Sequence, residues 1–122
     1  RDGHVINVGS VAGYQTYEGG AVYSASKFAV RALSESLRLD LCGKNIRVTE
    51  VAPGMVETEF SLVRFAQNSE AAQKVYQGIQ PLTAEDIACS MFFAMNQPKH
   101  VNLSLMTIMP TAQASATKLT RT

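Results

Sequence analysis

The sequence has little of the features that mark several specialised classes of protein. Eleven Lys and Arg residues stand against ten Asp and Glu residues, so the formal net charge is only +1. The charges are interspersed, with neither a basic block nor an acidic tail, which argues against binding nucleic acid or an anionic membrane. No apolar run approaches the roughly 18 residues that a membrane-spanning helix requires.

Cysteine is also scarce. Only Cys42 and Cys89 are present, which are too few and too far apart for a disulfide framework or a thiolate metal cluster. Both lie in apolar, periodic stretches, so we expect two free, buried thiols in a reduced, cytoplasmic protein. His4 and His100 are isolated and lack the spacing of metal ligands, and we therefore expect no metal site.

The chain is short and begins without an initiator methionine. Its 122 residues are enough for one domain at most. It has no charged segment followed by an apolar run, as a signal peptide would have. Because it opens just ahead of a strand-like run, we expect it to be a piece of a longer protein, a single partial domain over residues 1–122.

Short β-branched segments, each closed by glycine or proline, alternate with helical patterns. The segments that predict strands are 4–8, 46–51 and 103–109, and those that predict helices are 24–42, 69–78 and 84–96. This alternation is typical of an α/β protein with parallel strands. From Thr111 onward the residues are small and polar, so we expect an extended C-terminal tail over 111–122.

The longest predicted helix has an unusually wide apolar surface. Its apolar and small residues cover roughly 220° of the circumference, whereas a helix lying on one sheet face needs only about 100°. The surplus is centred on Ala25, Phe28, Ala32 and Leu39. A second covering element is therefore implied, either a missing part of the same chain or another subunit.

Three residues in a specific order suggest a catalytic site. Tyr23 and Lys27 are four residues apart at the start of the long helix, so they share a face one turn apart. Ser10 follows the first strand, at the edge where open parallel sheets bind ligands. Alone, such a tyrosine–lysine pair is usually surface decoration, and a serine after a strand is usually a turn residue. Their order, followed by Pro-Gly-Met-Val-Glu-Thr at 53–58, is much more specific.

In this order the chain resembles the C-terminal half of a short-chain dehydrogenase/reductase over nearly its whole length. Within that family it is most similar to the NADP-dependent 3-hydroxy acid dehydrogenases that act on serine and allo-threonine. The resemblance implies the C-terminal portion of a doubly wound, Rossmann-type parallel sheet, with three strands and flanking helices, in a homo-oligomer (dimer or tetramer). The segments that carry it are 23–30, 53–65, 81–86 and 109–113.

The resemblance implies acid–base catalysis by Ser10, Tyr23 and Lys27. Oxidation of an alcohol to a carbonyl removes a hydride, which the nicotinamide accepts, and a proton, which the protein must accept. A lysine ammonium one helical turn away stabilises the phenolate form of Tyr23, which can then act as the base. Ser10 would hold the substrate oxygen by a hydrogen bond. By resemblance, Tyr23 and Lys27 also contact the cofactor, Lys27 through the nicotinamide ribose.

The turn after the second strand is the second candidate binding segment. Pro53 and Gly54 leave the strand in a tight turn, which lets the backbone approach a ligand closely. By resemblance, the backbone near Val56 and the Thr58 side chain contact the nicotinamide carboxamide or a nearby phosphate. The resemblance also implies that residues 60–76 correspond to the mobile segment that covers the substrate in that family. Arg64 is a candidate partner for a substrate carboxylate, and an ordinary surface arginine is the equal alternative.

The sequence lacks the glycine-rich dinucleotide fingerprint and any residue that would read the ribose 2′ position. The resemblance favours NADP, but the sequence itself does not exclude NAD. Two alternatives to an oxidoreductase remain open, namely an inactive remnant and an assembly module that keeps the subunit interface of the fold. The residues upstream of Arg1 would discriminate between them.

Overall fold

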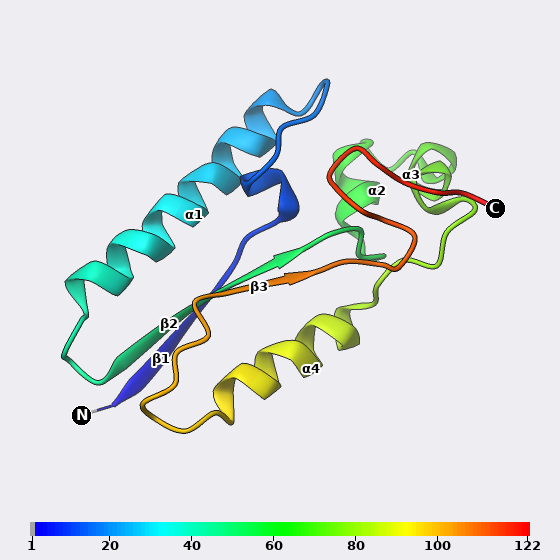
Figure 1. Ribbon diagram of the computed structural model, residues 1–122. Coiled ribbons are helices and arrows are strands. Elements are labelled where there is room, and N and C mark those ends of the chain that lie inside the picture. The colour runs from blue at the N-terminus through cyan, green and yellow to red at the C-terminus, as the bar shows by residue number, and fades with distance from the viewer. Residues whose placement is uncertain (1) are drawn as a thin grey trace.

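The computed structural model describes residues 2–122 and contains a parallel three-stranded sheet. The strand order is β1-β2-β3, as the blue, green and orange arrows of Figure 1 show. Both pairings are parallel, with Val8 beside Val51 and Val51 beside Met106. The three expected strands are confirmed, with the bounds β1 Gly3–Val8, β2 Ile46–Pro53 and β3 Leu105–Ile108.

Two long helices cover opposite faces of the sheet. Helix α1 (Ala21–Asp40) lies above the sheet in Figure 1, and α4 (Ala84–Met95) lies below it. Asn7 of β1 donates a hydrogen bond to Ser34 on α1, whereas Arg47 of β2 donates to the carbonyl of Ala94 on α4. Asn7 pairs with Glu50 of β2, which is three positions from Arg47. Because successive side chains along a strand alternate between its faces, Asn7 and Arg47 point to opposite faces of the sheet.

The ends of these helices follow from local chemistry. Thr83 accepts a hydrogen bond from the amide of Asp86, whose carboxylate in turn accepts from the Thr83 amide, and this capping box starts α4 where the sequence predicts. Helix α1 begins three residues before the predicted Ser24, and it ends just ahead of Gly43, which has a φ of 79°. An L-residue with a side chain seldom adopts that angle, so glycine suits the end of the helix.

The core is concentrated around β2. The last six residues of this strand are buried, and Val51 and Ala52 have no exposed surface. A strand that lies between two others, with helices on both faces, is enclosed on every side. From α4, Ile87 and Ala94 join this core.

The sequence-based expectation that both cysteines are buried was wrong. Both cysteines are free as expected, but Cys42 and Cys89 are exposed rather than buried. Cys42 lies in the turn that follows α1, beyond the last helical residue, so the helical periodicity no longer applies there. Cys89 lies on the side of α4 that faces away from the sheet, where Phe92 and Phe93 are also mostly exposed.

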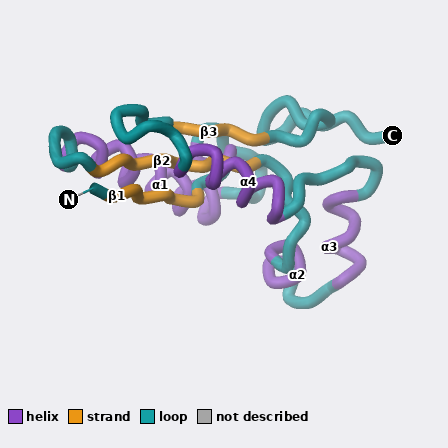
Figure 2. The backbone as a smooth tube through the Cα atoms, turned by 90° about the horizontal axis from the view of Figure 1, so that it is seen from below, coloured by secondary structure: helices purple, strands orange, loops and turns teal. Residues whose placement is uncertain are grey.

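Beyond the carboxyl ends of the strands, the chain is more folded than expected. A 3-10 turn, η1 (Val11–Gly13), and a short helix, α2 (Phe60–Arg64), were not predicted, whereas α3 (Ser69–Tyr76) was. Residues 111–122 do not form a simple extended tail, since they turn back to pair Gln113 with Leu119. Figure 2 shows α2, α3 and the C-terminus gathered beyond one end of the sheet.

Candidate active site

A cavity of about 500 Å³ lies at the carboxyl edge of the sheet, between the start of α1 and the segments that follow β2 and β3. Open parallel sheets commonly bind ligands at this edge, and the volume is suited to a small molecule. The structure brings all eight candidate residues to the walls of this one cavity: Ser10, Tyr23, Lys27, Pro53, Gly54, Val56, Thr58 and Arg64.

Ser10 is held by the turn that follows β1. The amide of Gly9 continues the sheet by donating to the carbonyl of Val51 at 2.7 Å. Ser10 then caps η1, because its Oγ accepts a hydrogen bond from the amide of Ala12 at 3.1 Å. The residue is only 8% exposed. Its hydroxyl proton is directed by none of these bonds and is available to a ligand in the cavity.

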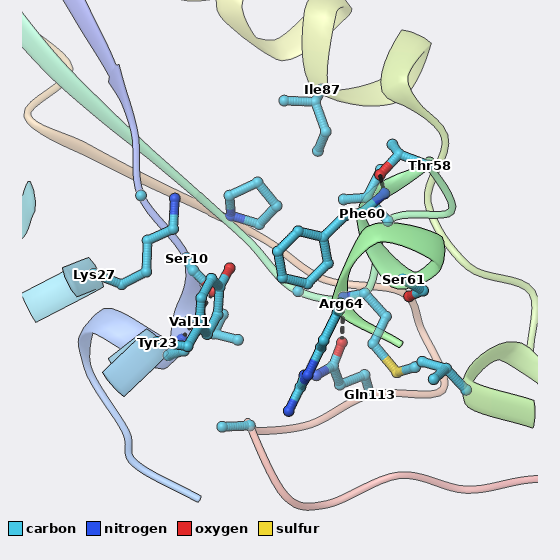
Figure 3. Close-up of a pocket in the computed structure, with 18 of the residues that line it drawn as sticks. Ser10, Val11, Tyr23, Lys27, Thr58, Phe60, Ser61, Arg64, Ile87 and Gln113 are labelled. Carbon is cyan, nitrogen blue, oxygen red and sulfur yellow. Dashed lines mark hydrogen bonds between the residues drawn. The ribbon is translucent and has the colours of Figure 1, made fainter. Parts of the chain in front are cut away.

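Tyr23 and Lys27 lie on the first two turns of α1 and face the same cavity (Figure 3). The Lys27 Nζ is 5.8 Å from the centre of the Tyr23 ring, and it donates a hydrogen bond to the carbonyl of Val8 at 3.2 Å. Gly13 packs against the Lys27 backbone so closely that an added Cβ would lie 2.7 Å from the Lys27 carbonyl oxygen. Glycine at 13 therefore lets the Ser10 turn pack directly on the helix that carries Tyr23 and Lys27.

A hydrogen-bonded pair that the sequence reasoning missed, Tyr14 and Glu50, lies next to the Ser10 turn. Glu50 on β2 is fully buried, and its Oε2 accepts a hydrogen bond from the Tyr14 hydroxyl at 2.6 Å. Burial first, and then this bond to Glu50, raise the pKa of Tyr14 to about 12. Arg31 stacks over the Tyr14 ring at 4.4 Å. A glutamate beside Val51, in the middle of a predicted strand, was the signal that could have revealed the pair.

The opposite wall comes from α2 and its neighbours. The ring of Phe60 lies 5.3 Å from that of Tyr23, centre to centre. The guanidinium of Arg64 lies 5.6 Å from the ring centres of both Tyr17 and Phe65, at a distance where cations are attracted to aromatic rings. In Figure 3 the Tyr23 ring lies between Lys27 on one side and Phe60 and Arg64 on the other.

The turn after β2 presents its backbone to the cavity. The carbonyl of Val56 accepts a hydrogen bond from the Tyr76 hydroxyl at 3.0 Å, but within residues 2–122 we find no partner for the Val56 amide. Thr58 lies two residues further on, and its hydroxyl accepts from the amide of Phe60. An unpaired amide beside a threonine hydroxyl suits a ligand with an acceptor group, such as the carboxamide of a nicotinamide.

The described part of the chain gives no sign of a metal centre. No group of three or more His, Cys, Asp or Glu side chains that could hold a metal ion occurs among residues 2–122. His4 instead shares a hydrogen bond with the Thr49 hydroxyl at 2.7 Å, and desolvation and the nearby Arg47 lower its pKa. No helix in the same range is long and apolar enough to cross a membrane.

Comparisons with known proteins point to one family. The family model described as short chain dehydrogenase matches residues 1–69. A serine 3-dehydrogenase of Rhizobium radiobacter is 47% identical over 116 residues, which are 95% of this chain and 47% of that protein. A sulfoacetaldehyde reductase of Chromohalobacter salexigens is 49% identical over 110 residues, which are 90% of this chain and 44% of that protein.

The fold agrees with these sequence similarities. The closed form of a serine dehydrogenase complexed with NADP+ superposes with a TM-score of 0.90 at 42% identity, covering 98% of this chain and 48% of that one. The parallel sheet and its flanking helices therefore match the Rossmann-type fold of that enzyme. The chain spans about half the length of the curated relatives that it matches.

Proposed function

Because this chain belongs to the short-chain dehydrogenase/reductase family, we propose that the protein is an NADP-dependent oxidoreductase that interconverts a hydroxyl and a carbonyl group. The proposed substrate is a small 3-hydroxy acid such as serine or allo-threonine. The observation that carries the proposal is the convergence of Ser10, Tyr23 and Lys27 on one cavity at the carboxyl edge of the sheet. In the same proposal, the chain is the C-terminal, catalytic half of the protein.

The three side chains have complementary parts in the proposed reaction. The Tyr23 hydroxyl takes up the proton of the substrate hydroxyl, or returns it in the opposite direction. The Lys27 ammonium stabilises the phenolate form of Tyr23 because its positive charge lies nearby. Ser10 donates its free hydroxyl proton to the substrate oxygen and so holds it against Tyr23.

The residues present fit a nicotinamide on the same side of the cavity. When bound, the nicotinamide would accept or supply the hydride. The Val56 amide and the Thr58 hydroxyl would hold its carboxamide, or a phosphate beside it, and the Pro53–Gly54 turn lets the backbone come close. Lys27 would also reach the adjoining ribose. The similarity to a serine dehydrogenase complexed with NADP+ supports NADP over NAD.

Arg64 is the proposed partner of the substrate's anionic group. A guanidinium binds a carboxylate through two parallel hydrogen bonds. The Arg64 guanidinium lies near the rings of both Tyr17 and Phe65, and these contacts limit the positions that its side chain can adopt. An arginine also binds a sulfonate, and the similarity to a sulfoacetaldehyde reductase makes such an aldehyde the second candidate substrate. Comparing kcat/KM for serine oxidation with that for sulfoacetaldehyde reduction separates these candidates.

We also propose a homo-oligomer, with α1 at the subunit contact. The residues of the outer face of α1 are exposed: Ala25, Phe28, Ala29, Ala32, Leu33 and Leu39. An exposed apolar surface of this size commonly marks a contact with another protein. If the protein kept only this contact, it would be an assembly module without activity, which is the remaining alternative function.

The decisive experiment replaces Tyr23 with phenylalanine in the full natural protein. Tyr23→Phe keeps the ring that packs against Phe60 but removes the hydroxyl that exchanges the proton. We expect kcat for serine oxidation to fall by about 10²–10⁴-fold, the usual contribution of an acid–base group. The affinity for NADP, measured by fluorescence titration, should stay within a few-fold. A nearly normal kcat would contradict the proposed proton transfer, and an inactive wild-type protein would favour the assembly module.

A further inference from the structure

Gln113 connects the C-terminal loop to the turn that follows β2. The residue is only 6% exposed, although its side chain is an amide. Its Oε1 accepts a hydrogen bond from the amide of Met55 at 2.8 Å, and its Nε2 donates to the carbonyl of Ser115 at 3.1 Å. A buried polar side chain satisfied in this way has a fixed orientation. Figure 3 shows Gln113 beside the cavity, across from Lys27.

This contact determines the path of the backbone between Gly54 and Val56. An added Cβ at Gly54 would collide with the Gln113 Oε1 and would lie 2.8 Å from the Met109 sulfur, so a side chain at position 54 would have to displace Gln113. The Met55 amide is held by Gln113, and the Met55 carbonyl accepts from the amide of Leu82 at 2.9 Å. Both peptide planes around Met55 are thereby fixed.

The fixed planes direct the Val56 amide into the cavity. In a trans peptide, the carbonyl of one residue and the amide of the next point in opposite directions. Because the Met55 carbonyl points toward Leu82, the Val56 amide points away from it, toward the cavity that Val56 lines. Gln113 holds the preceding peptide plane, between Gly54 and Met55. Without that hydrogen bond, the turn could rotate.

The loop that carries Gln113 is itself anchored at two other places near the cavity. The amide of Ala116 donates to the Gln15 side chain at 3.0 Å, next to the Ser10 turn. Arg121 donates to the carbonyl of Val75 at the end of α3, and the Thr122 amide donates to the carbonyl of Gly78. The loop therefore spans the rim of the cavity from the segment after η1 to the end of α3.

We propose that Gln113 is a positioning residue, which orients the Val56 amide to receive the carboxamide of a bound nicotinamide. The proposal rests on the proposed function, because it assumes that a nicotinamide cofactor occupies the cavity. Gln113 touches neither cofactor nor substrate in this scheme. It acts through the Met55 peptide, and the anchored loop holds Gln113 in place.

The test compares three variants of the full natural protein. Gln113→Met keeps the length of the side chain but removes both hydrogen bonds. Gln113→Glu has the shape of the amide, and in the uncharged form that burial favours it keeps an acceptor for the Met55 amide and a donor for the Ser115 carbonyl. Gln97→Met is the matched control, because Gln97 also donates to a backbone carbonyl, that of Phe93, but lies at the end of α4 and away from the cavity. Each variant is titrated with NADPH and with adenosine 2′,5′-bisphosphate, which lacks the nicotinamide. Hydrogen exchange at the Met55 amide is measured in parallel.

For Gln113→Met, we expect NADPH to bind roughly three- to tenfold more weakly, which is the usual value of one hydrogen bond. Binding of the bisphosphate should not change, and the Met55 amide should exchange faster. Gln113→Glu should lie closer to the wild type in both measurements, and Gln97→Met should match it.

The proposal would be overturned if Gln113→Met weakened the binding of NADPH and of the bisphosphate equally, or if hydrogen exchange at the Met55 amide did not change. If Gln113→Met fails to fold by circular dichroism, Gln113→Glu decides, because loss of Met55 protection in that variant contradicts the assigned bond. Wild-type protein that binds neither ligand would refute the proposed function instead, while the exchange data would still test the Gln113–Met55 link.

Discussion

Strand β2 and helix α1 pack against one another, yet the strand and the outer face of the helix differ sharply in burial. The last six residues of β2 are buried, and these include the polar residues Thr49 and Glu50. In α1 the buried residues are two serines, Ser24 and Ser34, whereas Leu39 is 74% exposed. The most apolar residues of the helix thus lie outside the core that the 122 residues form.

The difference shows which neighbours each element has within the chain. Strand β2 has a strand on either side and a helix on either face, so its surroundings are complete. Helix α1 has a sheet on one side and no covering element among residues 2–122 on the other. The wide apolar arc in its sequence is suited to two layers of neighbours. The sequence-based expectation of a second covering element agrees with the exposed outer face.

The largest expected effect comes from truncating one side chain in each region. Val51→Ala removes two buried carbons from β2, so we expect the free energy of unfolding to fall by about 2 kcal/mol. Leu39→Ala removes carbons that are already in contact with water, and the fall should be less than about 0.5 kcal/mol. Urea denaturation of the 122-residue chain, at a protein concentration well below the micromolar range in which we expect it to associate, measures both values.

A similar loss for the two variants would break the comparison, because Leu39 would then have to be covered in solution. Repeating the Leu39→Ala measurement at several protein concentrations identifies the cover. A loss that grows with concentration would point to a second copy of the chain.

A smaller effect is expected when the outer face of α1 is changed and self-association of the chain is measured. The exposed outer face of α1 should cause the 122-residue chain to associate at micromolar concentrations, because water is excluded when two such faces meet. Leu33→Lys combined with Leu39→Lys should reduce this association, since a charged group is costly to bury without a partner. Light scattering distinguishes the outcomes, and a wild-type chain that is a stable monomer of 13.2 kDa would refute the expectation.

The smallest effect concerns how stability depends on pH through the contact between Tyr14 and Glu50 of β2. Because the pKa of Tyr14 is raised to about 12, the folded chain holds that proton more tightly than the unfolded chain, where tyrosine ionises near pH 10. The stabilisation is complete below pH 10 and is lost as the pH rises from 10 to 12. Arg31 and Arg38 oppose the shift, and burial and Glu50 cause it.

We therefore expect the difference in Tm between the wild type and Tyr14→Phe to shrink between pH 9 and pH 11.5. Thermal denaturation at the two pH values checks this. A constant difference would mean that the Tyr14–Glu50 bond does not contribute to stability. The two proteins are identical at every other position, so contributions from the rest of the chain largely cancel in the comparison.

The strands and the main candidate residues could be predicted because their signals are local or regular. Runs of β-branched residues ended by glycine or proline predict β1 to β3. In a parallel sheet all strands end at the same edge, so residues that follow different strands come together there. This rule is enough to bring Ser10 and the 53–58 turn to one cavity, and the helix that follows adds Tyr23 and Lys27.

The remaining features could not be predicted because they depend on distant partners or on short elements. Helix α2 has five residues and no side-chain cap, so no periodic pattern marks it. The role of Gln113 depends on Met55, which is 58 positions away in the sequence. The exposure of Cys89 depends on which side of α4 meets the sheet, and the helix is apolar on more than one side.

The hydrogen bond between Gln15 and Ala116 joins residues 101 positions apart, which has a consequence for synthesis of the protein. At about 5–20 residues per second, a ribosome adds residue 116 roughly 5–20 s after residue 15. For most of that interval the chain already contains Ser10, Tyr23 and Lys27, but it does not yet contain the loop at the rim of their cavity. A nascent chain released early would therefore have the candidate catalytic side chains without the loop at the rim of their cavity.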